Sequence, residues 1–119
     1  MRKPIVAGNW KMNLTLAESR ALVAGVVDSV GSYTHCDIVV APTAISLAAV
    51  DELVEDTNVR LAAQNMHWAT GGAYTGEVSA EMLKDAGCTW VILGHSERRQ
   101  YFGETDEAIN HKAHVALSA

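Results

Sequence analysis

Short runs of apolar residues recur along the chain, separated by longer segments with helical periodicity. Four of these runs predict β-strands, at residues 4–8, 38–41, 59–63 and 90–94. The runs are nearly continuous rather than alternating with polar residues, a pattern typical of strands that are buried on both faces in a parallel sheet. We therefore predict four parallel strands with both faces covered.

The segments between the runs carry helix start and stop signals. Thr15 and Glu18 have capping-box spacing ahead of an apolar stripe at i, i+3, i+4 and i+7, which stops at Gly31. Ser79 is the expected N-cap of a short helix that ends at Gly87. In addition to the helix after Thr15, the pattern therefore predicts three helices, at residues 43–55, at 79–87 and from about 105 to 119.

Strands and helices therefore alternate, which is the pattern of an α/β fold with right-handed crossovers. We expect one domain over residues 1–119, with four parallel strands that are each followed by a helix. The connection at residues 65–78 is longer than usual, and such loops in compact domains are functional or interfacial. Within it, Trp68 and Tyr74 are either lids over the core or exposed anchors for another chain.

Composition narrows the functional classes. The net charge is −5 and the only basic cluster is Arg98-Arg99, which argues against nucleic-acid or anionic-membrane partners. No apolar segment approaches the roughly 18 residues of a membrane span, and the start lacks a signal-peptide core, so we expect a soluble cytoplasmic protein. Cys36 and Cys88 lack CxxC spacing and are interpreted as small hydrophobic residues, not as a disulfide or metal pair.

Polar residues follow the ends of all four predicted strands. Because the carboxyl ends of parallel strands meet at one edge of a sheet, these residues should converge there. They comprise a lysine, amides and an imidazole, at positions 9–11, 42–43, 64–65 and 95–99. The sequence therefore predicts a candidate active site at this edge.

His95 is the most informative of these residues. It follows a buried strand through Gly94, and Ser96-Glu97 begin a predicted helical turn that places backbone N–H groups near the imidazole. Such surroundings disfavour the imidazolium, so a neutral His95 can donate a hydrogen bond to a carbonyl oxygen that gains charge. The alternative is a histidine that only satisfies neighbouring backbone groups, and Lys11 taken alone is an ordinary surface lysine.

Other ionisable residues have simpler interpretations. Glu97, Arg98 and Arg99 predict an ion-pair network that holds a loop. His111 and His114 have i, i+3 spacing on the last helix, but no third ligand is in reach, so we interpret them as surface residues and predict no metal site.

Three blocks of sequence closely resemble the triosephosphate isomerase family, and the resemblance covers essentially the whole chain in order. The blocks are "GNWKMN" at 8–13, "AAQNMHWATGGAYTGEVSAEMLKDAG" at 62–87 and "GHSERR" at 94–99. A minor departure is "APT" at 41–43, where a second proline is common in the family. The family fold is an eight-stranded (β/α)₈ TIM barrel of about 250 residues. The resemblance therefore implies half of such a barrel, its first four βα units.

The resemblance also implies site roles. The family interconverts dihydroxyacetone phosphate and glyceraldehyde 3-phosphate in glycolysis and gluconeogenesis, without a cofactor. Asn9 and Lys11 match substrate-contacting residues, and Glu97 matches the carboxylate that pairs with Lys11. His95 matches the neutral electrophile, which is the known arrangement in this family.

The long loop matches the interface of the family's dimer. Thr75 matches the tip that inserts near a neighbouring subunit's site, Tyr74 lies beside it, and Gln64 and Asn65 match supporting and interface-side polar residues. The resemblance thus implies a homo-oligomer or a complementing C-terminal half as partner.

In the family, a glutamate base follows the sixth strand, the lid follows it, and the phosphate loops follow strands seven and eight. We therefore predict little or no activity for residues 1–119 alone, since Glu97 is aimed at the wrong atom to act as the base. The alternative is a non-catalytic half-barrel that self-associates through its open sheet edges. A flavodoxin-like nucleotide binder is disfavoured, because no glycine-rich phosphate motif follows the first strand.

Overall fold

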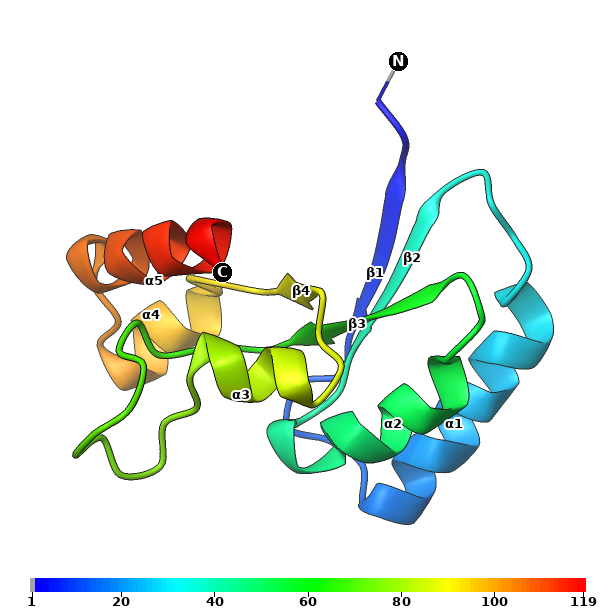
Figure 1. Ribbon diagram of the computed structural model, residues 1–119, viewed down its shortest axis with the longest axis horizontal. Helices are drawn as coiled ribbons and strands as arrows, with labels where there is room; N and C mark the ends of the chain where they lie inside the picture. The colour runs from blue at the N-terminus through cyan, green and yellow to red at the C-terminus, as the bar shows by residue number, and fades with distance from the viewer. Residues whose placement is uncertain (1) are drawn as a thin grey trace.

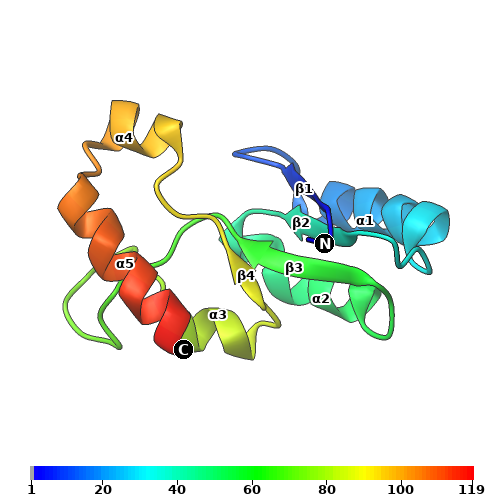
Figure 2. The ribbon, with the colours of Figure 1, turned by 90° about the horizontal axis from the view of Figure 1, so that it is seen from above.

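The structure is a computed structural model that describes residues 2–119. Its centre is one parallel sheet in the order β1-β2-β3-β4, which confirms the predicted α/β class and strand direction. The strands curl into half of a TIM barrel with helices between them (Figures 1 and 2). They are β1 (Ile5–Asn9), β2 (Asp37–Ala41), β3 (Val59–Ala63) and β4 (Trp90–Val91).

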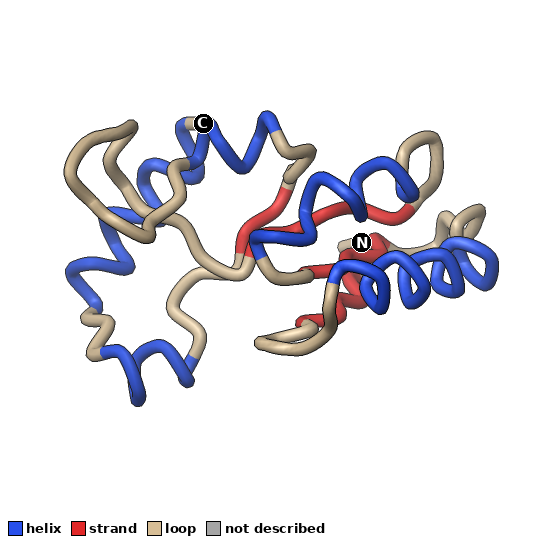
Figure 3. The backbone as a smooth tube through the Cα atoms, turned by 90° about the horizontal axis from the view of Figure 1, so that it is seen from below, coloured by secondary structure: helices blue, strands red, loops and turns tan. Residues whose placement is uncertain are grey.

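The helices fall into two groups. α1 and α2 lie side by side next to the first three strands, whereas α3, α4 and α5 lie at the other end of the molecule, around β4 (Figures 1 and 3). The elements are α1 (Leu16–Val30), the 3₁₀ helix η1 (Ala44–Ser46), α2 (Leu47–Val54), α3 (Ala80–Asp85), α4 (Ser96–Phe102) and α5 (Asp106–Ser118). No helix among residues 2–119 is long and apolar enough to cross a bilayer.

The predicted caps of α1 and α3 are present. The Thr15 hydroxyl accepts from the Glu18 N–H at 3.3 Å, and the Glu18 carboxylate accepts from the Thr15 N–H at 2.9 Å, which completes the capping box. Gly31 caps the other end of α1, and Ser79 caps the start of α3. These local signals fixed the helix boundaries because they satisfy otherwise unpaired backbone groups.

Alternate residues of a strand point to opposite faces of the sheet, so the buried residues form two clusters, one on each face. On the helix-covered face, Leu61 of β3 packs with Leu47 and Val50. Residues on the opposite face form a smaller cluster of Val39, Ala41 and Ala62, against which Ile92 packs. β2 and the end of β3 are therefore covered on both sides, as predicted, whereas Arg60 near the start of β3 is exposed.

That prediction is wrong for β1, where Ile5 is 54% and Val6 60% exposed. Within residues 2–119, β1 pairs with β2 alone, and its neighbouring residues Ile5 and Val6 point to opposite faces, so its second edge and both of its faces are exposed. The prediction is also wrong for β4, neither of whose residues is buried. The fourth strand is also shorter than the predicted 90–94. The Ile92 N–H still donates to the Ala63 carbonyl at 2.9 Å, but Gly94 has φ +69° and turns the chain away into α4.

Two helix predictions need correction. The segment at 43–55 is a 3₁₀ turn followed by α2, and not one helix. The helical turn expected at Ser96 is a seven-residue helix, α4, which a left-handed Gly103 ends before Thr105 caps α5. The chain between β4 and the end thus holds two helices where one was predicted.

Candidate active site

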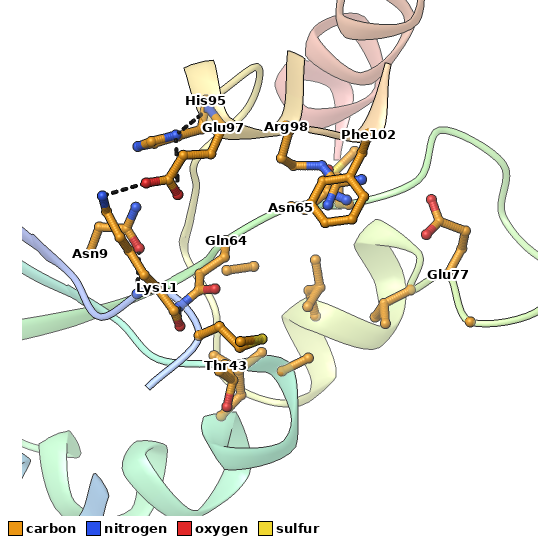
Figure 4. A pocket seen from close by; sticks show the side chains of 18 residues that line it. Asn9, Lys11, Thr43, Gln64, Asn65, Glu77, His95, Glu97, Arg98 and Phe102 are labelled. Atoms are coloured by element: carbon orange, nitrogen blue, oxygen red, sulfur yellow. Dashed lines mark hydrogen bonds and ion pairs between the residues drawn. The ribbon is translucent and has the colours of Figure 1, made fainter. Parts of the chain in front are cut away.

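The four segments after the strands do converge, as the sequence predicted. They line a cleft of about 380 Å³ at the carboxyl edge of the sheet (Figure 4). Its lining includes Asn9, Lys11, Thr43, Gln64, Asn65, His95 and Glu97. Each of these side chains lies at the carboxyl end of a strand or in the segment that follows it, so the parallel topology brings them together.

The backbone of Lys11 is held in a strained conformation by two amide side chains. Its φ of +56° lies in the left-handed region, which costs a non-glycine residue about 1–3 kcal/mol. The Lys11 N–H donates to Asn9 Oδ1 at 2.9 Å, and its carbonyl accepts from Gln64 Nε2 at 2.8 Å. Gln64 also donates to the Ala41 carbonyl at 2.8 Å, which ties together the ends of three strands. Lys11 is therefore placed by the fold, and not free on the surface.

Lys11 extends across the cleft to Glu97, as predicted. Lys11 Nζ lies 2.5 Å from Glu97 Oε1 (Figure 4). This hydrogen bond holds the pKa of the Glu97 carboxyl below its usual value and outweighs the opposing effect of partial burial. Glu97 is thus an ionised carboxylate that is engaged by a cation, which makes it a poor proton acceptor.

His95 is oriented by a backbone N–H in the first turn of the helix that it caps, α4. Its Nδ1 atom accepts from the Glu97 N–H at 3.1 Å, and its side chain is 29% exposed. An Nδ1 atom that accepts a hydrogen bond carries no proton, so the proton of the neutral ring is assigned to Nε2. This arrangement leaves Nε2–H as a donor for an oxygen atom in the cleft.

A second carboxylate, Glu77, lines the same cleft at the end away from His95 (Figure 4). Glu77 Oε1 lies 3.5 Å from His67 Nδ1. Among residues 2–119, Glu77 and Glu97 are the carboxylates that line the cleft, and both have a basic neighbour. Neither is placed as an unpaired base beside His95.

The arginines after His95 form the predicted ion pairs. Arg98 Nε donates to Glu104 Oε2 at 2.8 Å, and Arg99 pairs with Asp106. Arg98 also lines the cleft, as expected for the segment at 95–99, and its guanidinium lies 5.0 Å from the centre of the Phe102 ring. Arg98 therefore combines a structural contact with a position at the site.

Lys112 is the feature that the sequence reasoning missed. Its side chain is 4% exposed, and its Nζ lies 3.0 Å from Glu104 Oε2 and 2.9 Å from Asn65 Oδ1. A signal was available, because Lys112 stands three residues from both Ile109 and Val115, at an apolar position of the helical pattern. A charged residue at such a position indicates a buried partner.

The long loop carries an aromatic stack. The rings of Trp68 and Tyr74 lie 4.2 and 4.3 Å from that of His67, which is itself buried. Thr75 is exposed at the end of this stack and does not line the cleft of its own chain. Trp68 and Tyr74 stay partly exposed, at 36% and 48%, which favours the anchor interpretation over that of core lids.

The remaining candidates stay outside the site. His111 and His114 are exposed, as predicted. Cys36 is half-buried and Cys88 is buried, and both are free thiols. Burial, with the nearby charge of Asp51, raises the pKa of Cys88 to about 11. Across residues 2–119, no three His, Cys, Asp or Glu side chains are grouped to hold a metal ion.

Comparison with known proteins identifies the family. The model of the triosephosphate isomerase family matches residues 4–119. The triosephosphate isomerases of Herpetosiphon aurantiacus and Chlorobium luteolum are each 52% identical, over 99% and 100% of this chain and 47% and 48% of their own. That of Alkaliphilus oremlandii is 54% identical over 98% of this chain and 47% of its own. The chain spans about half the length of the curated relatives it matches, and it belongs to the triosephosphate isomerase family.

Proposed function

We propose that this chain supplies the lysine and histidine part of an active site that interconverts dihydroxyacetone phosphate and glyceraldehyde 3-phosphate. The observation that carries the proposal is the convergence of Lys11 and His95 on one cleft, with Lys11 held by Asn9 and Gln64. The family membership supplies the reaction. In a cell we expect this reaction to run in the cytoplasm, as part of glycolysis and gluconeogenesis.

In this proposal, the substrate carbonyl lies against His95. Proton removal beside the carbonyl produces an enediolate, whose oxygen gains negative charge. His95 Nε2–H donates to that oxygen, and the Lys11 ammonium, beside Asn9, attracts both the enediolate and the substrate phosphate. Glu97 keeps Lys11 pointed across the cleft and acts through it, since the two groups lie 2.5 Å apart.

The step that lacks a group within residues 2–119 is proton removal. Glu97 is ionised and paired with Lys11, and Glu77 lies at the far end of the cleft beside His67. A positioned base contributes about 10² to 10⁴ in rate. We therefore propose that residues 1–119 have little or no activity alone and need a second segment that carries a carboxylate base and a phosphate-binding loop.

We further propose that Asn65, Tyr74 and Thr75 belong to an interface between two copies of the protein. Thr75 is exposed next to the His67 stack, and the loop is closed at its base by the His67 N–H, which donates to the Val78 carbonyl at 2.8 Å. A closed loop with a polar tip suits insertion into a second molecule. Thr75→Arg should shift the sedimentation profile toward the monomer, and an unchanged concentration dependence would remove this part of the proposal.

The second candidate is a half-barrel that self-associates and does not catalyse. The specific observation in its favour is β1, whose apolar residues Ile5 and Val6 are exposed beside an unpaired edge. The two functions differ in their response to ligand. The second function is favoured if the chain forms a stable oligomer that unfolds cooperatively and dihydroxyacetone phosphate does not change its unfolding midpoint.

The test of the isomerase proposal is a chimera of residues 1–119 and the remaining half of the Herpetosiphon aurantiacus relative. We expect turnover of dihydroxyacetone phosphate that falls by about 10² to 10³ in His95→Gln, the loss typical of one oxyanion donor. Lys84→Met, which removes an exposed lysine from α3, is the matched control and should keep full activity. A folded chimera without turnover, or one indifferent to His95→Gln, refutes the proposal.

A further inference from the structure

The helix that carries the site has no buried side chain of its own. α4 begins directly after His95 and contains Glu97, yet none of its residues is buried. Over residues 89–119, all of which the structure describes, Lys112 is the one buried residue. Apolar packing therefore cannot be what fixes α4, and its position must come from polar contacts.

Those contacts meet at one carboxylate. Glu104 follows α4, and its side chain is 4% exposed. Its Oε2 atom accepts from Arg98 Nε of α4 at 2.8 Å and from Lys112 Nζ of α5 at 3.0 Å, while its Oε1 atom is buried and has no hydrogen-bond partner within residues 2–119. Burial alone would raise the pKa of Glu104, but the hydrogen bonds from Arg98 and Lys112 outweigh it and lower that pKa. Glu104 is thus an anion that joins the two helices.

Lys112 continues the connection to the sheet. Its ammonium also donates to Asn65 Oδ1 at 2.9 Å, directly after Gln64 at the end of β3. Gln64 is the residue that holds the Lys11 carbonyl. A continuous path therefore runs from the Lys11 backbone through the end of β3, Lys112 and Glu104 to the helix of His95. The direct link between the two sides of the cleft, Lys11 to Glu97, is about half exposed to solvent.

We propose that Lys112 is a positioning residue for the active site, which sets His95 and Glu97 on α4 at a fixed place relative to Lys11. The inference rests on the proposed function for the catalytic roles of His95 and Lys11. The contacts that position α4 are independent of that function. Lys112 touches no cleft-lining reactive group; it acts through Asn65 on one side and through Glu104 and Arg98 on the other.

Stability alone gives a poor account of this lysine. A buried ion pair often stabilises a fold less than well-packed apolar residues of the same volume, because both charges lose their hydration. The unpartnered Oε1 atom of Glu104 adds to the cost. Two directional contacts, to Asn65 after β3 and to Glu104 after α4, instead give fixed geometry, which an apolar side chain at position 112 would not provide.

The test uses the isotope-labelled chain of residues 1–119 and two NMR readouts. The first is the ¹⁵N shift of the His95 ring nitrogens, which reports the tautomer and the hydrogen bond to Nδ1. The second is amide exchange in α4 relative to β3. We expect Lys112→Met to change the His95 shifts. Amide exchange in α4 should become about tenfold faster, because the variant loses a hydrogen bond to a charged group, and exchange in β3 should stay unchanged. Lys112→Arg, which keeps the charge, should recover part of both signals.

Two controls separate positioning from general destabilisation. Lys84→Met removes a lysine from the surface of α3 and should leave both readouts unchanged. Val50→Ala opens a cavity in the buried face of α2 and should lower global stability without altering the His95 shifts. Equal changes in Val50→Ala and Lys112→Met would overturn the proposal, as would unaltered His95 shifts in Lys112→Met.

If Lys112→Met does not fold, the same two readouts are measured in Glu104→Gln. This variant keeps the shape of the Glu104 side chain and removes the negative charge that Lys112 contacts. Altered His95 shifts in folded Glu104→Gln support the proposal, and native shifts overturn it. Neither readout needs turnover, so the two proposals can fail separately. If the chimera is inactive but Lys112→Met still alters the His95 shifts, the proposed reaction is refuted and the positioning role of Lys112 stands.

Discussion

The two ends of this chain are held together by different forces. From β1 to β3, α1 and α2 cover one face of the sheet with fully buried aliphatic residues such as Val23, Val50 and Leu61. From residue 89 onward the most buried side chains are the charged pair Lys112 and Glu104, each 4% exposed, and charged contacts connect α4 and α5. The first region is built on fully buried apolar side chains, whereas the second packs only partly buried apolar residues, such as Leu93 and Val115, against that core and connects its helices by ion pairs.

The difference matches what each region has to do. Apolar burial is strong but non-directional, so it suits a scaffold that must only stay folded. Hydrogen bonds between charged groups fix distance and angle, so they suit the helix that carries His95 and Glu97. The residues of the cleft sit where the two regions meet, with Lys11 on the core side and His95 on the ion-pair side.

The largest effect is expected in the core. Leu61→Ala removes a side chain that is 2% exposed and should cost about 2–5 kcal/mol of unfolding free energy. Urea unfolding followed by circular dichroism measures it. Leu117→Ala, on α5 at a position that is 87% exposed, is the control and should cost less than about 0.5 kcal/mol. Similar losses in both variants would contradict the division into two regions.

Acid should weaken the ion-pair region next. The pKa of Glu104 is lowered in the folded chain, so its contribution to stability is present above its unfolded pKa, near 4.5, and is lost as pH falls through the folded value. Glu104→Gln removes this dependence. Urea midpoints measured from neutral pH to about pH 3 should therefore fall less steeply in the variant than in the parent chain. Parallel pH profiles would show that Glu104 is not the linked group.

A smaller effect is expected at the start of α1. Thr15→Ala removes the N-cap hydroxyl that accepts from Glu18 and should cost about 1 kcal/mol. Because α1 belongs to the core region, the loss should appear in global unfolding, while amide exchange in α4 keeps its parent pattern. Thr15→Ser, which retains the hydroxyl, should restore most of the stability. A loss as large with serine as with alanine would assign the effect to the methyl group instead.

The smallest effect on stability is expected at the cleft itself. Lys11→Met breaks a pair whose side chains are 50% and 43% exposed, and solvent weakens such contacts. The urea midpoint should stay within experimental error. In the chimera, the same substitution should abolish most of the isomerase activity, because Lys11 contributes its positive charge to the reaction and little to the stability of the fold. A clear drop in the midpoint would make Lys11 a structural residue.

The sequence predicted what local chemistry determines. The capping box at Thr15, the strand at 59–63 and the convergence of the segments at 9–11 and 95–99 follow from residue type, periodicity and parallel topology. The pairing of Lys11 with Glu97 was implied by the family resemblance. The sequence-based prediction failed where the outcome depends on distant parts of the chain. Ile5 and Val6 have the pattern of a buried strand, but nothing in residues 2–119 covers them.

Burial of the Lys112 and Glu104 pair was also beyond periodicity alone. Most lysines are solvated, and the partners of Lys112 lie 8 and 47 residues away, so only the folded chain reveals them. Its place in an apolar stripe was the available hint. The short length of β4 could not be predicted for a related reason, since the apolar run continues through Leu93 while the strand ends at Val91, before Gly94 turns the backbone.

The central proposal is that residues 1–119 supply the electrophile and the lysine of an isomerase site, and that the base comes from a second segment. Triose phosphate turnover by the purified chain alone, at neutral pH and in a folded state verified by circular dichroism, tests it most directly. The account predicts no rate above the buffer background. A solitary chain that turns over triose phosphate robustly, at a rate that His95→Gln abolishes, would contradict it.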